Sequence, residues 1–323
     1  MLQYIKIKFK EIGKMGLFNG YLKEGRGVDK NEKKKRGFFL YIDILWQKMS
    51  KLVAANCLYS ITSIIWIVLL YFFFGYVLIY TGVANSVTDV IMSAMPDGDA
   101  AVVAGNVMVQ LQIFFAVSVF VMWGSGPSSA AYAYVNRSFT RQEPVWVVSD
   151  GWDKFKENFK QSMIVLLIDA LFLFFAIFSV YYYRNLYTSQ HNIIWLMLEY
   201  IVIVASVIYT MMHSYIYQIM VTFDCSIGTI YKNALLITLA KLPGNVLTTA
   251  ISAGFLFLVF IIINLNALFA AIIVMVFGLC FTRYVTDFYA ARVIEKTVLK
   301  NMKAKEAKPP VIEYLDDEED TAE

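Results

Sequence analysis

The sequence predicts an all-α, polytopic membrane protein with six transmembrane helices in three consecutive hairpins. Hydrophobic residues make up 59% of its 323 residues and charged residues only 16%, and it contains 25 Phe and 21 Tyr. Its mean hydropathy is +0.59. A soluble domain typically carries about 25% charged residues, so we expect most of this chain to be solvated by lipid.

Six apolar runs are long enough to cross the hydrocarbon layer as helices, which takes about 20 residues. The last two runs share an uncharged stretch that Asn264-Leu265-Asn266 divides, and the paired Asn residues indicate a tight turn. None of the runs alternates like a barrel strand, so helices are expected. The runs lie at about residues 54–80, 100–123, 162–183, 193–217, 245–263 and 267–284.

Positive charge is distributed unevenly over the predicted connections. Of the 28 Lys and Arg residues, all but Arg184 lie before the first run, in the second and fourth connections, or in the tail. Cytoplasmic loops are enriched in Lys and Arg, so both termini should be cytoplasmic. We therefore divide the chain into a basic segment (1–53), a transmembrane domain (54–284) and a tail (285–323) with an acidic, disordered end.

The cytoplasmic segment 149–163 is predicted to form an amphipathic helix that lies in the membrane interface. Ser149 or Asp150 can cap its start, its aromatic residues suit the headgroup boundary, and its lysines suit anionic lipid. Docking of a partner is a compatible alternative, whereas nucleic-acid binding would need a larger basic patch or a recognition fold. The aromatic face consists of Trp152, Phe155, Phe159 and Met163, with Asn158, Lys154, Lys156 and Lys160 nearby.

The string GSGPS, which begins at Gly124, predicts a broken helix end. It lacks the strand-turn-helix context of a phosphate loop. Gly126 loosens the helix and Pro127 has no backbone donor, and the small residues that follow favour close helix packing. A second stretch, IYKNALLITLAKLP, carries Lys-Asn before an apolar run at Asn233; this is typical of any cytoplasmic helix entry, or of repeated hairpins.

Ionisable residues within the apolar runs are candidates for a functional site, because burying a charge in a membrane is costly. Asp169 and His213 lie near the cytoplasmic ends of neighbouring runs, so a contact that carries a proton or binds a polar substrate is geometrically reasonable. Glu199 lies too far along the axis to join them. Alternatively, Asp169 and Glu199 face a polar seam while His213 reaches the surface. Arg283 and Asp287 fit an ordinary cytoplasmic boundary.

No catalytic motif is recognisable, and the three cysteines share no metal-ligand spacing. We therefore expect neither an enzyme nor a bound metal or cofactor.

A further observation concerns five stretches that together cover about residues 17–296: LFNGYLKEGRGVDKNE, GPSSAAYAYVNR, FKENFKQS, YIYQIMVTFDCSIGTIYKNALLITLAKLP and FTRYVTDFYAARVIEK. These stretches resemble the YesL-like family of bacterial integral membrane proteins, whose function is unknown. The chain departs from the family pattern at Gln218, where Pro is usual, and in a 14-residue N-terminal extension, which makes Met15 a candidate start.

The resemblance implies a bacterial plasma-membrane protein that supports carbohydrate uptake, because genes of this family often lie beside sugar-uptake genes. The expected partners are lipid and a sugar ABC-transporter permease, with a homo-oligomer as a further option and no nucleic acid. Arg137, Asn158 and Phe159 are the first residues to test as contacts. The full set of candidate partner or lipid contacts is Gly126, Pro127, Arg137, Trp152, Phe155, Asn158, Phe159, Lys160 and Asn233. The principal alternative is a small secondary transporter that uses Asp169 and His213; an ABC permease subunit and a membrane enzyme are weaker alternatives.

Overall fold

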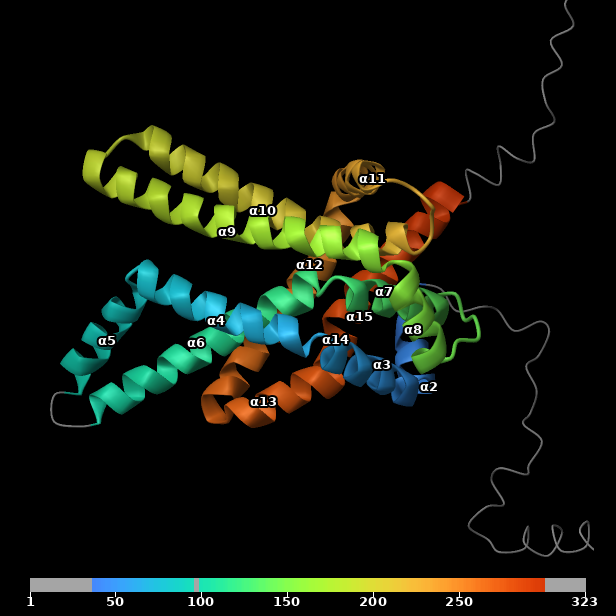
Figure 1. Cartoon of the computed structure of the whole chain (residues 1–323), viewed down its shortest axis with the longest axis horizontal. Helices are drawn as coiled ribbons and strands as arrows, with labels where there is room; N and C mark the ends of the chain where they lie inside the picture. Colours follow the sequence, from blue (N-terminus) through green and yellow to red (C-terminus); the bar gives the residue numbers. More distant parts are fainter. Residues whose placement is uncertain (1–36, 96–98, 300–323) are drawn as a thin grey trace, which may run out of the picture. The chain divides into compact units, whose positions relative to one another are not determined.

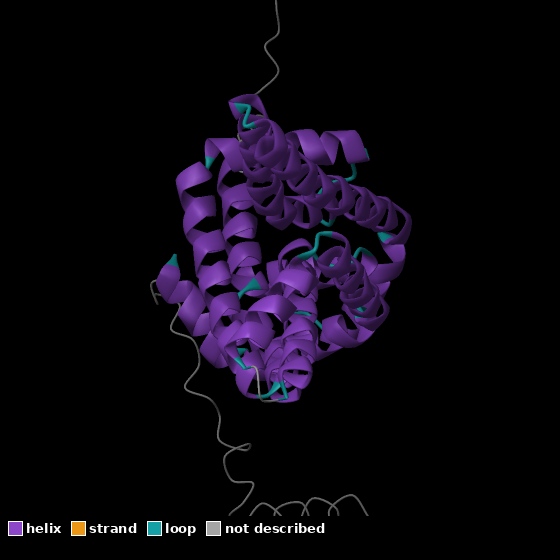
Figure 2. Ribbon diagram, turned by 90° about the vertical axis from the view of Figure 1, so that its left-hand side faces the viewer, coloured by secondary structure: helices purple, strands orange, loops and turns teal. Residues whose placement is uncertain are grey.

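The computed structural model describes residues 37–95 and 99–299. The chain divides into two compact units, residues 1–40 and 41–323. The boundary falls within the first described helix (Phe38–Gln47), and all the other described helices belong to the second unit. Every regular element in the described ranges is helical (Figure 2). The basic N-terminal segment before residue 37 and the acidic tail lie outside the described residues.

The helices follow one another with short connections (Figure 1). In chain order they are α2 (Phe38–Gln47), α3 (Met49–Thr62), α4 (Ile64–Tyr80), α5 (Val83–Ala94), α6 (Ala100–Trp123), α7 (Pro127–Thr140), α8 (Val147–Glu157), α9 (Phe159–Gln190), α10 (Ile193–Met220), α11 (Ile227–Ala240), α12 (Leu242–Leu265), α13 (Ala267–Ile273), the π-helix η1 (Val274–Gly278), α14 (Leu279–Phe281), α15 (Arg283–Ile294) and the π-helix η2 (Glu295–Leu299).

Four of the described helices, α6, α9, α10 and α12, are long and apolar enough to cross a membrane, and α3 with α4 makes a fifth if the bent pair is one span. The bend is 60°. Thr62 Oγ1 donates back to the carbonyls of Leu58 and Tyr59, and such bonds compete with the helical ladder and bend it. The described residues thus confirm an all-helical fold with several helices that are long and apolar enough to cross a membrane.

The predicted sixth span, residues 267–284, is interrupted in the structure. It is divided into α13, η1 and α14, and Thr282 separates α14 from α15. It is not among the described helices that are long and apolar enough to cross a membrane. The predicted turn before it is present, because α12 ends at Leu265 and α13 begins at Ala267. Whether this broken segment crosses the membrane stays a prediction.

Long helices pair into hairpins, with α9 packed along α10 and α4 along α6. Figure 1 shows the two pairs extending from the region where α7 and α15 lie, with α5 joining α4 to α6 at their far end. The helix α5 was not expected, because residues 81–99 read as a loop. Away from α7 and α15 the hairpins expose large apolar side chains, for example Ile201 and Val204 on α10.

A second region, which we call the base, consists of α7, α15 and residues 209–220 of α10. These three segments pack on one another, and most of their side chains are buried. Although α7 is rich in Ser, Tyr and Asn, it lies at the centre of this packing. The small residues after Pro127 allow the close approach that the sequence predicted.

The predicted amphipathic helix at residues 149–163 is two helices. The first, α8, begins at Val147, and the carboxylate of Asp150 accepts a hydrogen bond from the backbone N–H of Trp146, 2.9 Å away. The helix thus starts before the expected residues. Asp150 still satisfies a backbone donor at this start, whereas the Ser149 hydroxyl donates to Asp150. The break falls at Asn158, whose backbone N–H and side-chain amide both donate to the Lys154 carbonyl, at 3.1 and 3.0 Å.

Candidate functional site: a buried polar network

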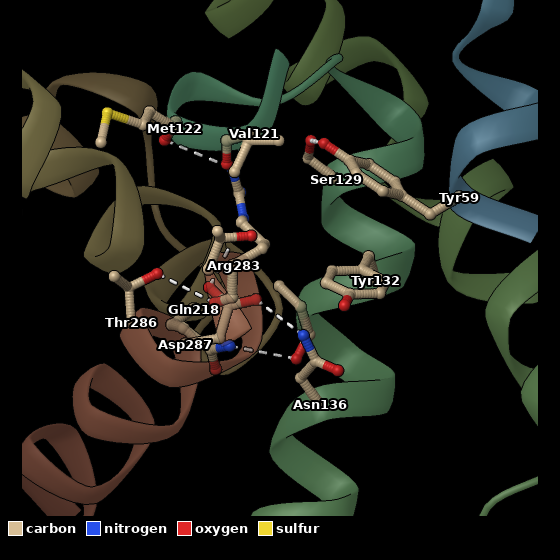
Figure 3. Close-up of polar contacts among 12 residues, drawn as sticks. Tyr59, Val121, Met122, Ser129, Tyr132, Asn136, Gln218, Arg283, Thr286 and Asp287 are labelled. Carbon is tan, nitrogen blue, oxygen red and sulfur yellow. Dashed lines mark hydrogen bonds and ion pairs between the residues drawn. The ribbon is translucent and has the colours of Figure 1, made fainter. Parts of the chain in front are cut away.

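The break after α6 creates a polar centre in the base. Gly124 has φ 94° and Gly126 φ 69°, which favour glycine, so α6 stops at Trp123. Carbonyls at the end of a helix lack intrahelical donors. Arg283 Nη1 donates to the carbonyls of Val121 and Met122, each at 3.4 Å (Figure 3). A buried cation thus stabilises the negative end of α6.

Asp287 balances the charge of Arg283 one turn further along α15. Its Oδ1 lies 3.7 Å from Arg283 Nε, and its Oδ2 accepts a hydrogen bond from Asn136 Nδ2 on α7 at 2.8 Å. Burial raises the pKa of Asp287 above its ordinary value, while the charge of Arg283 and the Asn136 hydrogen bond oppose that rise. Both Arg283 and Asp287 are buried.

Hydroxyl and amide groups join this centre to α3. Tyr59 and Ser129 share a hydrogen bond of 3.1 Å, and the Tyr132 hydroxyl donates to Asn56 Oδ1 at 2.7 Å. Asn56 Nδ2 in turn donates to the carbonyl of Val276 in η1 at 2.8 Å. A π-helix displaces its carbonyls from the regular ladder, and here a buried amide satisfies one of them. Figure 3 shows Tyr59, Ser129 and Tyr132 beside the Arg283–Asp287 pair.

Asp169 and His213 form a second buried centre. His213 Nε2 lies 2.9 Å from Asp169 Oδ1, and the Tyr209 hydroxyl donates to the same oxygen at 2.6 Å. The indole of Trp123 stacks on the His213 ring at 5.7 Å between centroids. The contact between Asp169 and His213 that the sequence indicated is present. The alternative position of His213 at the surface is wrong, because its exposed fraction is 0%.

The two centres meet at Tyr217. Tyr209, His213 and Tyr217 recur at every fourth residue, so they share one face of α10. The centroid of the Tyr217 ring lies 5.9 Å from that of His213 and 5.5 Å from the guanidinium of Arg283. We call this chain of side chains, from Asp169 to Asn136, the polar network.

Several buried atoms of the polar network have no hydrogen-bond partner within the described ranges. A buried atom that stays without a partner costs about 1–3 kcal/mol relative to a satisfied one. A small cavity of about 10 Å³ is lined by Thr282, Thr286 and by Val121 and Met122, whose carbonyls accept hydrogen bonds from Arg283. The atoms without a hydrogen-bond partner are Asp169 Oδ2, His213 Nδ1, Gln218 Oε1, Asp287 Oδ1, and Nε and Nη2 of Arg283. Of these, Asp287 Oδ1 and Arg283 Nε still form the ion pair described above.

Glu199 is separate from the polar network, as expected. It is buried on the outer part of α10 and pairs with Arg184 of α9, whose guanidinium lies 2.6 Å from its carboxylate. This pair closes the α9–α10 hairpin. Within the described residues, no three His, Cys, Asp or Glu side chains are grouped so that they could hold a metal ion.

Four of the residues predicted to touch a partner are occupied by packing. Gly126 and Pro127 are buried at the start of α7, and Asn158 is buried at the helix break. Arg137 Nη1 donates to the Val221 carbonyl at 2.9 Å and so caps the end of α10.

The remaining predicted contacts are accessible. Trp152 and Phe159 are 50% and 45% exposed, Phe155 is half-buried, and Lys160 and Asn233 are exposed. Trp152 stacks on Phe155 at 5.1 Å, and Phe155 lies 5.8 Å from Phe159. We call Trp152, Phe155 and Phe159 the aromatic ladder. It continues from α8 into α9 across the break at Asn158.

The sequence interpretation missed most of the polar network. It placed Arg283 and Asp287 at an ordinary cytoplasmic boundary, and this was wrong because both are buried in the base. Asn136 and Gln218 were not considered as site residues. A signal was present: α7 carries several polar residues, follows two glycines, and is too short and too polar to be a span.

Comparison with known proteins gives one match. Residues 107–180 match the family "Protein of unknown function, DUF624". No curated protein and no solved structure matches the chain. The match runs from the inner part of α6 through α7 and α8 into α9, and it includes GPSSAAYAYVNR and FKENFKQS. The described part of the chain is thus all-helical, has helices that are long and apolar enough to cross a membrane, and is similar over this segment to a family of unknown function.

Proposed function

We propose that this chain is a YesL-like, six-span protein of the bacterial plasma membrane with both termini in the cytoplasm. In this proposal it has no catalytic activity and serves carbohydrate uptake as an accessory subunit, docking on a sugar permease through the aromatic ladder. The exposed ladder on a firmly packed support is the observation that carries the proposal. Exposed aromatic residues are enriched at protein interfaces.

The closed state of the polar network favours an accessory role over transport. Asp169 and His213 are 2% and 0% exposed, and Arg283 and Asp287 are buried to the same degree. The adjoining cavity of about 10 Å³ has room for roughly one water, which is far smaller than a sugar. In this arrangement the network ties broken helices together, and the ladder remains available to a partner.

A small secondary transporter is the second candidate, and one observation favours it. Asp169 Oδ2 and His213 Nδ1 are both buried without a hydrogen-bond partner among the described residues. An acid–imidazole pair with spare acceptor capacity can take up and release a proton. In this case the polar network would couple a proton to a substrate in a more open state.

Co-purification from native membranes in mild detergent tests the accessory role. We expect sugar-permease subunits to accompany the tagged protein. Phe159→Ala removes an exposed ring of the ladder and should lower their yield several-fold. Phe175→Ala, a matched control on the same helix and also exposed, should leave the yield unchanged. Equal recovery with both variants would exclude docking through the ladder.

Uptake by cells that carry Asp169→Asn distinguishes the second candidate. Asn keeps the size of the side chain but cannot exchange a proton near neutral pH. An accessory protein should retain uptake if the variant remains folded and bound to its partner. Loss of uptake with permease binding intact would favour the transporter.

A further inference from the structure

An apolar groove lies between α3, α7 and α8. The rings of Tyr59 and Tyr132 contribute to its lining, while their hydroxyls form the hydrogen bonds described above. Its volume is about 90 Å³, and it is open on one side of these helices. Its walls are formed by Ala55, Leu58, Tyr59 and Thr62 of α3, Ser128, Ala131, Tyr132 and Val135 of α7, and Val147, Val148, Gly151, Trp152 and Phe155 of α8.

The groove owes its width to small residues. At Gly151, an added Cβ would lie 3.8 Å from both Leu58 and Val135, so the three helices approach closely here and leave space beside them. An apolar cavity of about 150 Å³ can hold a molecule such as benzene. A groove of this size therefore accepts a few methylene groups of a chain that continues along the open side.

Positive charge marks one end of the groove. Lys48 and Lys51 lie at the start of α3 and share one face of that helix with the groove residues, because successive members are three or four residues apart. The groove residues on this face are Ala55, Leu58 and Thr62. Neither lysine forms an ion pair with a described residue. Burial and the neighbouring charge of Lys51 lower the pKa of Lys48, which indicates that a nearby negative charge would be favourable.

The occupant must therefore have a long apolar part and a negative end. We propose that the groove between α3, α7 and α8 binds one acyl chain of an anionic phospholipid, with Lys48 and Lys51 contacting the headgroup phosphate. The walls of the groove do not belong to the long helices: α3 is bent by 60° from α4, and α8 is a separate short helix. Lysines near the membrane surface attract anionic lipid, and aromatic residues such as Trp152 suit the interface. This site does not depend on docking to a permease.

Native mass spectrometry of the full chain tests the site. The protein is reconstituted in nanodiscs of equimolar phosphatidylglycerol and phosphatidylcholine, then extracted in mild detergent. We expect about one phosphatidylglycerol to stay bound per chain. Lys48→Gln and Lys51→Gln should each lower the preference for phosphatidylglycerol about fivefold. Lys232→Gln, which removes an exposed lysine from α11, should not change it.

Filling the groove should abolish lipid retention. Gly151→Leu places a side chain between Leu58 and Val135, and Val148→Trp fills the rim from a residue that is already exposed, so at least the second variant should fold. Gly105→Leu is the control, since nothing lies within 4 Å of an added Cβ there. Unchanged lipid retention in folded Val148→Trp would overturn the proposal. So would retention of a peptide or a second copy of the chain in place of lipid.

Discussion

The helices α4 and α7 reverse the usual relation between apolar composition and burial. In α4, IIWIVLLYFFFGYVLIY, large side chains such as Ile65 and Phe72 are exposed. In α7, PSSAAYAYVNRSFT, almost every residue is buried, including Ser129 and Asn136. In water this pattern would be unstable. In a membrane it is expected, because lipid is as apolar as leucine and gives helices no hydrophobic reason to associate.

The difference shows where the structural specificity of this protein lies. The exposed faces of α4 and the outer part of α10 need only be apolar, so many residue types can replace one another there. In the base, small residues permit close packing, and buried hydrogen bonds join helices that are interrupted at Gly124 and Thr282. Substitutions should therefore have large effects in the base and small effects in the hairpins.

The largest effect is expected from removing one partner of the buried ion pair. Arg283→Met should destabilise the protein by about 3–5 kcal/mol, because Asp287 is left as an unpaired buried charge and the end of α6 loses its donor. The double variant Arg283→Met with Asp287→Leu should recover a large part of that loss. Denaturation in detergent, followed by the reactivity of the buried Cys280 thiol, measures both. If single and double variants are equally unstable, the pair is not coupled.

Two isoleucines of the same helix give the next contrast. Ile216 is 0% exposed in the base and Ile201 is 61% exposed in the hairpin, both on α10. Ile216→Ala leaves a cavity and should cost about 2–5 kcal/mol. Ile201→Ala changes a lipid-facing side chain and should stay within about 0.5 kcal/mol. The same detergent denaturation reports both, and similar losses would show that the hairpin is packed against something in the assembled protein.

Hydropathy predicted the helices because each lipid-exposed face needs a long run of apolar residues. It gave the all-α class, the boundaries of α6 and the turn at Asn266 well. The Asp169–His213 contact also followed, since the end of one long helix and the start of its antiparallel neighbour lie side by side. These features depend on the length of each apolar run and on the position of a residue within that run, and both are obtained by counting residues in the sequence.

The base could not be derived in this way. Whether Arg283 faces water or protein depends on how α15 packs against α7, and no pattern along the chain encodes that packing. Hydropathy treated Arg283 and Asp287 as residues in solvent, where an i, i+4 pair is ordinary. The division of the predicted helix at Asn158 was missed for a related reason, because the aromatic ladder continues across the break and keeps the helical spacing.

The smallest contrast concerns two glycines with positive φ. Gly124 in the base has φ 94° and ψ −158°, a region that is essentially restricted to glycine and costs other residues about 1–3 kcal/mol. Gly82, at the tip of the α4–α6 hairpin, has φ 74° and ψ 2°. This left-handed helical conformation is one that Asn also adopts. The two sites thus differ in conformation as well as in surroundings.

Gly124→Ala should be more destabilising than Gly82→Ala, and Gly82→Asn should be nearly neutral. A Cβ at Gly124 would collide with Ser129 and lie 3.1 Å from Arg283 Nη1, whereas nothing lies within 4 Å of one at Gly82. Adding Ser129→Gly to Gly124→Ala removes the collision but leaves the backbone strain, so it should restore only part of the stability. Full restoration would assign the requirement for glycine at the end of α6 to space alone. If no stability is restored, glycine is required at the end of α6 because of the backbone conformation. The close approach of α7 to Arg283 would then be a consequence of this turn rather than its cause.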